Sequence, residues 1–340
     1  MNKINKAIIL IVLSVFLIEL TVDAQQHAAN QKTPEMFFGD TTRLGVPFAK
    51  DPHVIRFKGR YLMYYSVPGF TDKAGKLYGW GIGIAESKDL NNWKRIADVN
   101  VDPDAIYEAK GFAAPCALVI GDKVHLFYQT YGNGMKDAIC HAWSTDGIRF
   151  TRNQTNPIFS PDGVWNCGRA IDAEVISFKG QYFLYYATRD PDFKIQMLGV
   201  AVAAGNTNFN REDWINLSKD QPVLKPQFPW EETCTEGASV VEMNQCLFMF
   251  YAGAYNNRPQ QIGVAKSSDG IKWERLSNKP FLENGEPGTW NSCESGHPHL
   301  FKDENGKTYL FFQGNNDFGK TWHISNMKMY WRNEMPFIKK

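Results

Sequence analysis

Neither sign of charge dominates this chain of 340 residues, in which Lys and Arg number 37 and Asp and Glu number 36. A protein without a basic excess lacks the electrostatic field that attracts nucleic acid, so we expect no nucleic-acid partner. Zinc motifs are missing too, because no cysteines form a CxxC pair and no cysteines and histidines show zinc-site spacing. These absences argue against nucleic-acid-binding and zinc-dependent classes.

Long apolar runs are equally scarce. The one run of note, residues 7–18, is shorter than the roughly 20 residues that a membrane span requires. Lys3 and Lys6 precede this run and small residues follow it, which is the pattern of a secretory signal peptide. We therefore expect residues 1–24 to direct export to the periplasm or the extracellular space. Residues 25–33 are expected to form a flexible segment, and the mature chain is expected to have no membrane span.

Cysteine pairing stays open at the level of the sequence. An exported chain can form disulfides, but buried free thiols would fit the same strand-rich segments. Both alternatives apply to the six cysteines, which are Cys116, Cys140, Cys167, Cys234, Cys246 and Cys293.

What the sequence does contain is a repeated hairpin. Residues 54–57 and 60–65 are rich in aromatic and β-forming residues and are joined at Lys58-Gly59, so they predict two antiparallel strands preceded by Asp51. The pattern returns four times at intervals of about 60 residues. The positions that match Asp51 are Ala114, Asp172, Gly237 (with Glu236 one residue before it) and His297.

Each repeat also carries a second half, which reads as a third strand, a tight turn and a fourth strand that starts at an aromatic residue. In the first four repeats these residues are Trp93, Phe150, Trp214 and Trp273. In the fifth, residues 321–325 and 329–331 are the expected third and fourth strands. Four strands repeated five times predict an all-β protein, a five-bladed β-propeller that occupies residues 34–340 as one catalytic domain. A β-sandwich or a solenoid is the alternative.

The matching positions bring acids together. The innermost strands of a propeller begin at one mouth of its channel, so we expect Asp51, Asp172, Glu236 and His297 around one pocket. Hydrolysis of a glycosidic bond needs one carboxylate to activate water and one carboxylic acid to protonate the leaving oxygen. A third carboxylate can raise the pKa of the acid. Acids near strand starts can also simply accept backbone N–H groups, which is the structural alternative.

In these motifs the sequence resembles glycoside hydrolase family 43, with families 32, 62, 68 and 117 as relatives. The similar segments are Asp51-Pro52, Ile171-Asp172, Glu236-Gly237 and Gly296-His297, and the likeness spans residues 45–325. The resemblance implies that Asp51 is the general base, that Asp172 tunes and orients the acid, and that Glu236 is the general acid. It also implies that His297 lies on the axis and touches a calcium ion or a water molecule, with no cofactor required for the reaction.

The sequence departs from the family pattern at several points. Ala173 and Ala238 replace prolines, and Cys116 replaces an aspartate. The Trp-x-Asn-Asp-Pro-Asn motif of family 32 is absent, which argues against a fructosidase. These departures leave the sugar and its linkage open.

Further residues are candidates for substrate binding. Trp80, Trp165 and Trp290 are expected to stack on sugar rings, with packing between blades as the alternative. Similar loops precede Arg169 and Glu294, so both are expected beside the pocket. Four arginines could bind the carboxylate or sulfate of an acidic sugar, but structural ion pairing is the favoured alternative for each; they are Arg43, Arg169, Arg189 and Arg258.

Glu294 is also the alternative general acid, and Glu174 is a weaker one. We expect Asp172 to raise the pKa of Glu236, and His297 to lower that of Glu294. This argument prefers Glu236.

The sequence thus predicts an exported glycoside hydrolase. It is expected to be inverting and exo-acting on oligosaccharides from plant or algal polysaccharides, with an activity of the arabinofuranosidase, xylosidase or galactosidase type. The alternative is a propeller that binds carbohydrate without catalysis.

Overall fold

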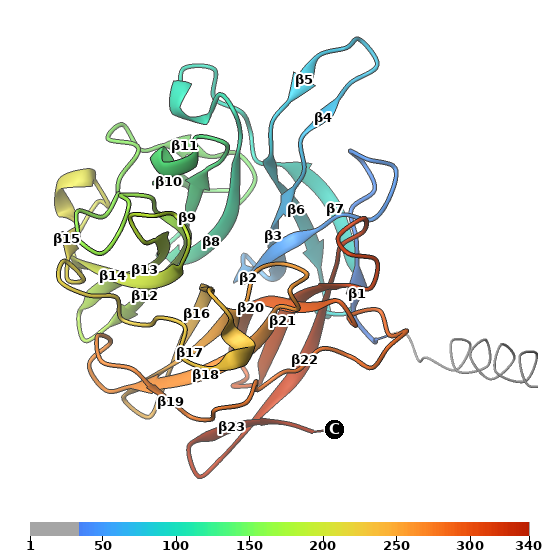
Figure 1. Ribbon diagram of the computed structural model, residues 1–340. Helices are drawn as coiled ribbons and strands as arrows, with labels where there is room; N and C mark the ends of the chain where they lie inside the picture. Colours follow the sequence, from blue (N-terminus) through green and yellow to red (C-terminus); the bar gives the residue numbers. More distant parts are fainter. Residues whose placement is uncertain (1–33, 340) are drawn as a thin grey trace, which may run out of the picture.

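The computed structural model describes residues 34–339, and the predicted signal peptide and flexible segment lie outside this range. Five antiparallel sheets surround a common axis, so the predicted five-bladed β-propeller is confirmed (Figure 1). The only helices in the described range are four single 3-10 turns, and no helix there is long and apolar enough to cross a membrane.

Each blade is built from consecutive strands, with the innermost strand first. Blade I contains β2 (Lys50–Phe57), β3 (Arg60–Val67), β6 (Gly81–Ser87) and β7 (Trp93–Asp98), with the small hairpin of β4 (Phe70–Thr71) and β5 (Leu77–Tyr78) projecting from it. Blade II contains β8 (Phe112–Ile120), β9 (Lys123–Thr130), β10 (Ile139–Ser144) and β11 (Thr151–Arg152). Blade III contains β12 (Ile171–Phe178), β13 (Gln181–Arg189), β14 (Gln196–Ala204) and β15 (Ile215–Asn216). Blade IV contains β16 (Thr235–Met243), β17 (Cys246–Gly253), β18 (Gln261–Ser267) and β19 (Glu274–Arg275).

Blade V differs from the prediction. Its first strands are β20 (Glu294–Lys302) and β21 (Thr308–Asn315), but the two short segments expected after them form one strand, β22 (His323–Arg332). The outer partners of β22 are β1 (Phe37–Phe38), from the beginning of the described chain, and β23 (Met335–Ile338). The start of the chain therefore closes the ring on the last blade, which removes an open edge.

The innermost strands share one irregularity. Each carries a β-bulge at the same place, where its register with the second strand shifts. The first strand of blade I thus begins before Asp51 and not after it. The residue inside the bulge has a left-handed backbone in every blade, with φ between 41° and 55°, and these residues are Asp51, Ala114, Asp172, Gly237 and His297. Because a bulge re-aims side chains, the five repeats direct this position into the channel in the same way.

Two residues beyond the bulge, a second ring of side chains ties each blade to the next. Four of these side chains accept a backbone N–H from the following blade. At the closing junction the ring of His299 instead donates from Nε2 to the carbonyl of Val54, at 3.0 Å. The five members of this ring are His53, Cys116, Glu174, Ser239 and His299. The blades are thereby locked together directly beneath the expected site.

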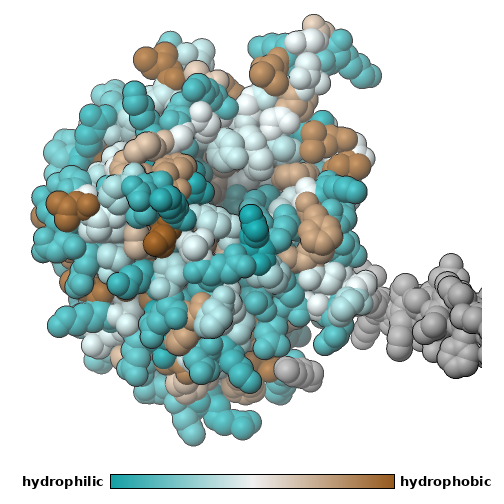
Figure 2. Space-filling model, in the orientation of Figure 1, coloured by the Kyte–Doolittle hydropathy of each residue, from teal (hydrophilic) through white to brown (hydrophobic). Residues whose placement is uncertain are grey.

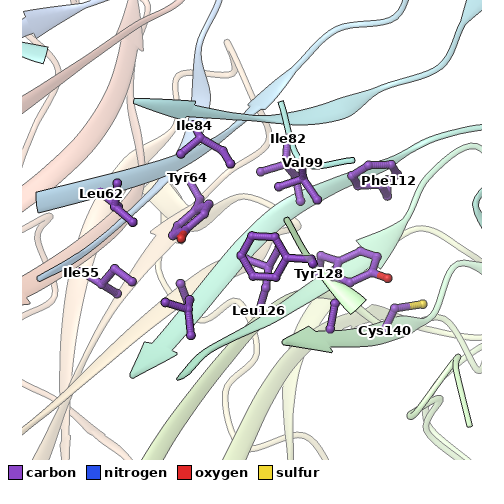
Figure 3. Packing of buried hydrophobic residues seen from close by; sticks show 14 of the residues in the cluster. Ile55, Leu62, Tyr64, Ile82, Ile84, Val99, Phe112, Leu126, Tyr128 and Cys140 are labelled. Carbon is purple, nitrogen blue, oxygen red and sulfur yellow. The ribbon is translucent and has the colours of Figure 1, made fainter. Parts of the chain in front are cut away.

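Apolar side chains fill the space between facing blades. Figure 3 shows the contact of blades I and II, where Ile55 and Tyr64 pack against Leu126 and Tyr128. Burial of each such side chain contributes about 1.5–3 kcal/mol relative to exposure. The rigid inter-blade packing fixes the innermost strands, and with them the residues that line the channel.

The face seen in Figure 2 is mainly hydrophilic, with hydrophobic residues scattered over it. All six cysteines are free thiols, so the disulfide alternative does not apply to this structure.

Candidate active site

A cavity of about 290 Å³ opens at one mouth of the channel. All five blades contribute to its wall, as the sequence pattern requires of a site built from repeats. Of the residues expected there, the cavity is lined by Asp51, Asp172, Glu236, His297, Arg169 and Trp80. The predicted convergence of residues that lie about 60 positions apart is therefore present.

His297 joins two of the acids. Its Nδ1 lies 3.2 Å from Oδ1 of Asp51, and its Nε2 lies 3.3 Å from Oε1 of Glu236. Glycine follows Glu236 because a β carbon at Gly237 would lie 2.9 Å from Nδ1 of His297. One imidazole ring thus holds Asp51 and Glu236 on opposite sides.

Side-chain amides fix the acids from below. The backbone N–H of Asp51 donates to Oε1 of Gln313 at 2.8 Å, and that of Asp172 donates to Oε1 of Gln129 at 2.8 Å. Glu236 accepts hydrogen bonds from the side-chain amides of Gln196 and Gln260. Oδ2 of Asp172, in contrast, is buried and has no partner within residues 34–339.

The pKa values follow from these contacts. Burial acts to lower the pKa of His297, but the carboxylates around it, Asp51 first, outweigh burial and raise the pKa to about 10. Burial raises the pKa of Asp172 to about 7, although the charge of His297 acts to lower it. Burial would also raise the pKa of Glu236, but its hydrogen bond and charge interaction with His297 lower it overall. Of the two carboxyls, Asp172 is therefore the one that burial, and next to it the charge of Glu236, favours in the protonated form.

The pKa argument made from the sequence is wrong in direction. Asp172 was expected to raise the pKa of Glu236, yet the contact with His297 lowers it. Burial raises the pKa of Glu294 to about 7, and the more distant His297 opposes this only weakly. The reason is geometric, since the bulge places the His297 ring against Glu236 and not against Glu294.

We expect the raised pKa of Asp172 to make the free energy of unfolding depend on pH. The folded protein holds this proton up to about pH 7, whereas the ordinary value for Asp is 3.8. The stability that Asp172 contributes is therefore complete below about pH 4 and is lost as the pH rises through 7. The side chain of Asp172→Asn cannot ionise. Its melting temperature relative to the wild type should therefore be a few degrees higher at pH 8 than at pH 4.

Asp146 provides the control for this measurement. It lies in an outer turn where, although burial raises its pKa, hydrogen bonds from the backbone N–H groups of Arg149 and Ile148 lower the pKa overall. Asp146→Asn should therefore be less stable than the wild type by an amount that builds up as the pH rises to about 4 and stays constant above it. A melting-temperature difference for Asp172→Asn that does not change with pH would contradict the assigned proton.

Glu294 lies beneath the pocket and does not line it. Its side chain is fully buried and accepts from Gln313, Asn256 and the N–H of Asn257. Because Gln313 in turn accepts the N–H of Asp51, Glu294 supports the position of Asp51 from below. In this position Glu294 does not face the cavity, so it does not provide the contact with substrate that the sequence predicts.

Glu174 belongs to the second ring on the axis. Its Oε2 accepts from Nε2 of His53 at 3.3 Å, and its Oε1 accepts the N–H of Val240 at 2.8 Å. His53, Glu174 and His299 are close enough to hold a metal ion. However, Nδ1 of His53 accepts the N–H of Ala117, so its Nε2 carries the proton and offers no lone pair. We therefore assign this ring a structural role.

The expected substrate-binding residues divide into two groups. Trp80 lines the cavity and packs beside Tyr131, with ring centroids 5.0 Å apart. Trp165 instead donates to the carbonyl of Ser218. Trp290 packs against Phe37 and Phe312 at the side of blade V. Neither Trp165 nor Trp290 lines the cavity.

Several pocket residues were not predicted as site residues. They share amide or hydroxyl side chains that face the cavity, and they are Gln129, Tyr131, Gln196, Tyr255 and Asn256, together with the cation Lys50. A signal for one of them was present, because Gln129 and Gln313 occupy the same position in the second strand of their repeats. The others lie where loops meet strands, and no repeat marks them.

A calcium ion at His297 stays a prediction. Asp172, Glu236 and His297 are close enough to hold an ion, and calcium prefers oxygen ligands such as carboxylates. Both nitrogens of His297 already face carboxylates, and the raised pKa keeps both protonated. Direct coordination by His297 does not fit this arrangement.

The family model of "Glycosyl hydrolases family 43" matches residues 46–336. The chain belongs to this family. Its members act on glycosidic bonds, so the protein is a glycoside hydrolase whose substrate is a carbohydrate. No curated protein matches the chain.

Several solved structures share the fold. A thermostable family 43 glycoside hydrolase superposes with a TM-score of 0.67 at 17% identity, covering 89% of this chain and 96% of that one. An endo-1,4-beta-xylanase from Bacteroides thetaiotaomicron gives 0.67 at 21% identity, with 86% and 94% covered. An alpha-L-arabinofuranosidase from Lactobacillus brevis gives 0.67 at 17% identity, with 92% and 97% covered. At these identities the likeness shows the fold alone.

Proposed function

We propose that the protein is an exported, inverting, exo-acting glycosidase that removes terminal sugars from oligosaccharides of plant or algal polysaccharides. In this proposal Asp51 is the general base, Glu236 the general acid, and Asp172 the residue that supplies and tunes the acid's proton. The observation that carries the proposal is the grouping of these three acids in one pocket, with Asp51 and Glu236 on opposite sides of His297.

The position of His297 supports inversion. Retaining enzymes keep their two carboxyl groups about 5–5.5 Å apart, and inverting enzymes keep them about 6.5–9.5 Å apart to admit a water molecule. A ring that contacts one carboxylate through Nδ1 and the other through Nε2 supports the wider spacing of an inverting pair. A water molecule activated by Asp51 could then attack the face of the sugar opposite to Glu236.

The size of the cavity supports exo action. Small-molecule sites have volumes of about 300–1,000 Å³, and this cavity of about 290 Å³ lies at the lower end. It suits one terminal sugar better than a polysaccharide chain that passes through. A propeller that only binds carbohydrate has no need of an opposed acid and base, so the arrangement favours the enzyme over the non-catalytic alternative.

A panel of aryl glycosides tests the proposal. We expect release of the aryl group from an α-L-arabinofuranoside, a β-D-xyloside or a β-D-galactoside, or from a related acidic sugar. NMR of the first-formed product should show the inverted anomer. A retained anomer would contradict inversion, and sugar binding without cleavage of any glycoside would favour the non-catalytic propeller.

A further inference from the structure

Two arginines stand on one wall of the pocket without full charge partners. Arg169 and Arg189 both line the cavity. The guanidinium carbons lie 5.7 Å and 4.3 Å, respectively, from the ring centroid of Phe193. Arg189 also lies 5.1 Å from the ring centroid of Tyr255, another pocket residue. Blade III thus presents a pair of guanidinium groups that share one aromatic ring.

Of the two guanidinium groups, Arg189 has no carboxylate partner among residues 34–339, and Arg169 has only a long ion pair. The Nε of Arg189 donates to Oε1 of Gln196 at 3.0 Å, and Arg189 forms no ion pair among residues 34–339. Arg169 has a loose ion pair, 3.7 Å from Oδ2 of Asp137, and its buried Nε has no hydrogen-bond partner in the same range.

The acids of the pocket compensate this charge only in part, because three acids line the cavity beside four cationic side chains. Asp51 and Glu236 contact His297, which is itself cationic, and Lys50 adds another positive group to the wall. Like charges around one concave site repel one another, and an anion between them relieves this repulsion where a neutral hydroxyl does not. The planar fork of a guanidinium also matches the two oxygens of a carboxylate or a sulfate.

We infer that Arg169 and Arg189 form an anion subsite, and that the sugar bound in the pocket carries a negatively charged substituent, a carboxylate or a sulfate ester. The inference rests on the proposed function only in taking the pocket as a sugar site, and it requires no catalysis. Phe193 and Tyr255 hold the two guanidinium groups in place, and Gln196 connects Arg189 to Glu236. Recognition of the charged substituent is thereby coupled to the position of the expected acid.

Calorimetric titration with monosaccharides tests the inference on the intact protein. D-galacturonic acid and D-glucuronic acid are compared with D-galactose and D-glucose, and D-galactose 6-sulfate distinguishes sulfate from carboxylate. We expect at least one anionic sugar to bind about 10- to 100-fold more tightly than its neutral counterpart, because charge-assisted hydrogen bonds are the stronger kind. The preference should weaken as salt is raised.

Variants locate the effect. Arg189→Gln and Arg169→Gln should each reduce the preference for the anionic over the neutral sugar to a few-fold or less. Arg189→Lys should fall between, because it keeps the charge but loses the fork. Arg149→Gln, on an exposed outer turn of blade II, removes the same charge and should change nothing.

Two results would overturn the inference. The first is equal affinity for anionic and neutral sugars, which includes no measurable binding of either. The second is a preference for the anionic sugar that persists in both arginine variants. Because binding alone is measured, a protein that passes this test but cleaves no glycoside would refute the proposed function and leave the subsite standing. If the protein instead cleaves neutral glycosides and shows no preference for anionic sugars, the anion subsite would be refuted and the proposed function would stand.

Discussion

Asp51→Asn should lower turnover at least about a hundredfold and leave the fold intact. A general base contributes about 10² to 10⁴ in rate, and an amide cannot take the proton of the attacking water. The backbone of residue 51 is left-handed, with φ of 51°, and asparagine is among the residues that adopt this conformation most readily. The N–H that donates to Gln313 is unchanged by the substitution. Loss of activity would therefore report chemistry and not unfolding.

The measurement is the initial rate on a cleaved glycoside, with circular dichroism and the melting temperature as checks of the fold. Asp220→Asn, on an exposed loop, makes the same chemical change away from the pocket and should retain full activity. Turnover near the wild-type level in Asp51→Asn would remove Asp51 from the role of base. A loss accompanied by a large fall in melting temperature would instead show that the carboxylate holds His297 in place.

The repeats explain why the fold could be predicted. Hairpins such as 54–57 with 60–65 carry a local alternating pattern, and five copies at regular spacing leave few architectures other than a propeller. The closing strand could not be predicted in the same way. β1 is two residues long, and its partner β22 is almost 300 residues away in the sequence, so neither local pattern nor spacing indicates the pairing.

The site was predictable in position but not in detail. Asp51, Asp172 and His297 occupy equivalent positions of the repeat, so their convergence follows from the fold. Glu236 precedes that position by one residue, and its contact with His297 depends on the direction that the bulge gives to each side chain. The pKa of each acid depends on contacts of a few ångströms, and the spacing of residues in the sequence does not predict contacts at that precision.

The tryptophans show the same limit. Trp80 and Trp290 both lie in loops near strand ends, yet one faces the cavity and the other packs on Phe312. An aromatic residue in a propeller loop can serve either purpose, and only the path of the loop decides between them. The two arginines were among the candidates in the sequence, but only the structure shows that they share one wall of the cavity and that Arg189 has no carboxylate partner among residues 34–339.

The choice between Glu236 and Glu294 as general acid now rests on access. Taken alone, the pKa values favour Glu294, which burial raises to about 7, over Glu236, whose pKa His297 lowers despite burial. Geometry comes first, however, because an acid must reach the leaving oxygen within hydrogen-bond distance. Glu294 is fully buried and its oxygens are occupied by three donors, whereas Glu236 lines the cavity. Near neutral pH Asp172 retains a proton beside Glu236, so the pair together holds the proton that the reaction needs.

Leaving-group dependence decides the assignment. Removal of the general acid should slow substrates with poor leaving groups, such as natural disaccharides, by about 10² to 10⁴, and should largely spare dinitrophenyl glycosides, whose leaving group needs no protonation. Glu236→Gln should show this contrast. Glu294→Gln should slow both kinds of substrate to a similar and smaller extent, because it disturbs the support of Gln313 and Asp51 without removing a proton donor. A contrast confined to Glu294→Gln would place the acid in blade V. A contrast confined to Asp172→Asn would mean that the residue that holds the proton in the empty pocket also delivers it, with Glu236 reduced to fixing His297.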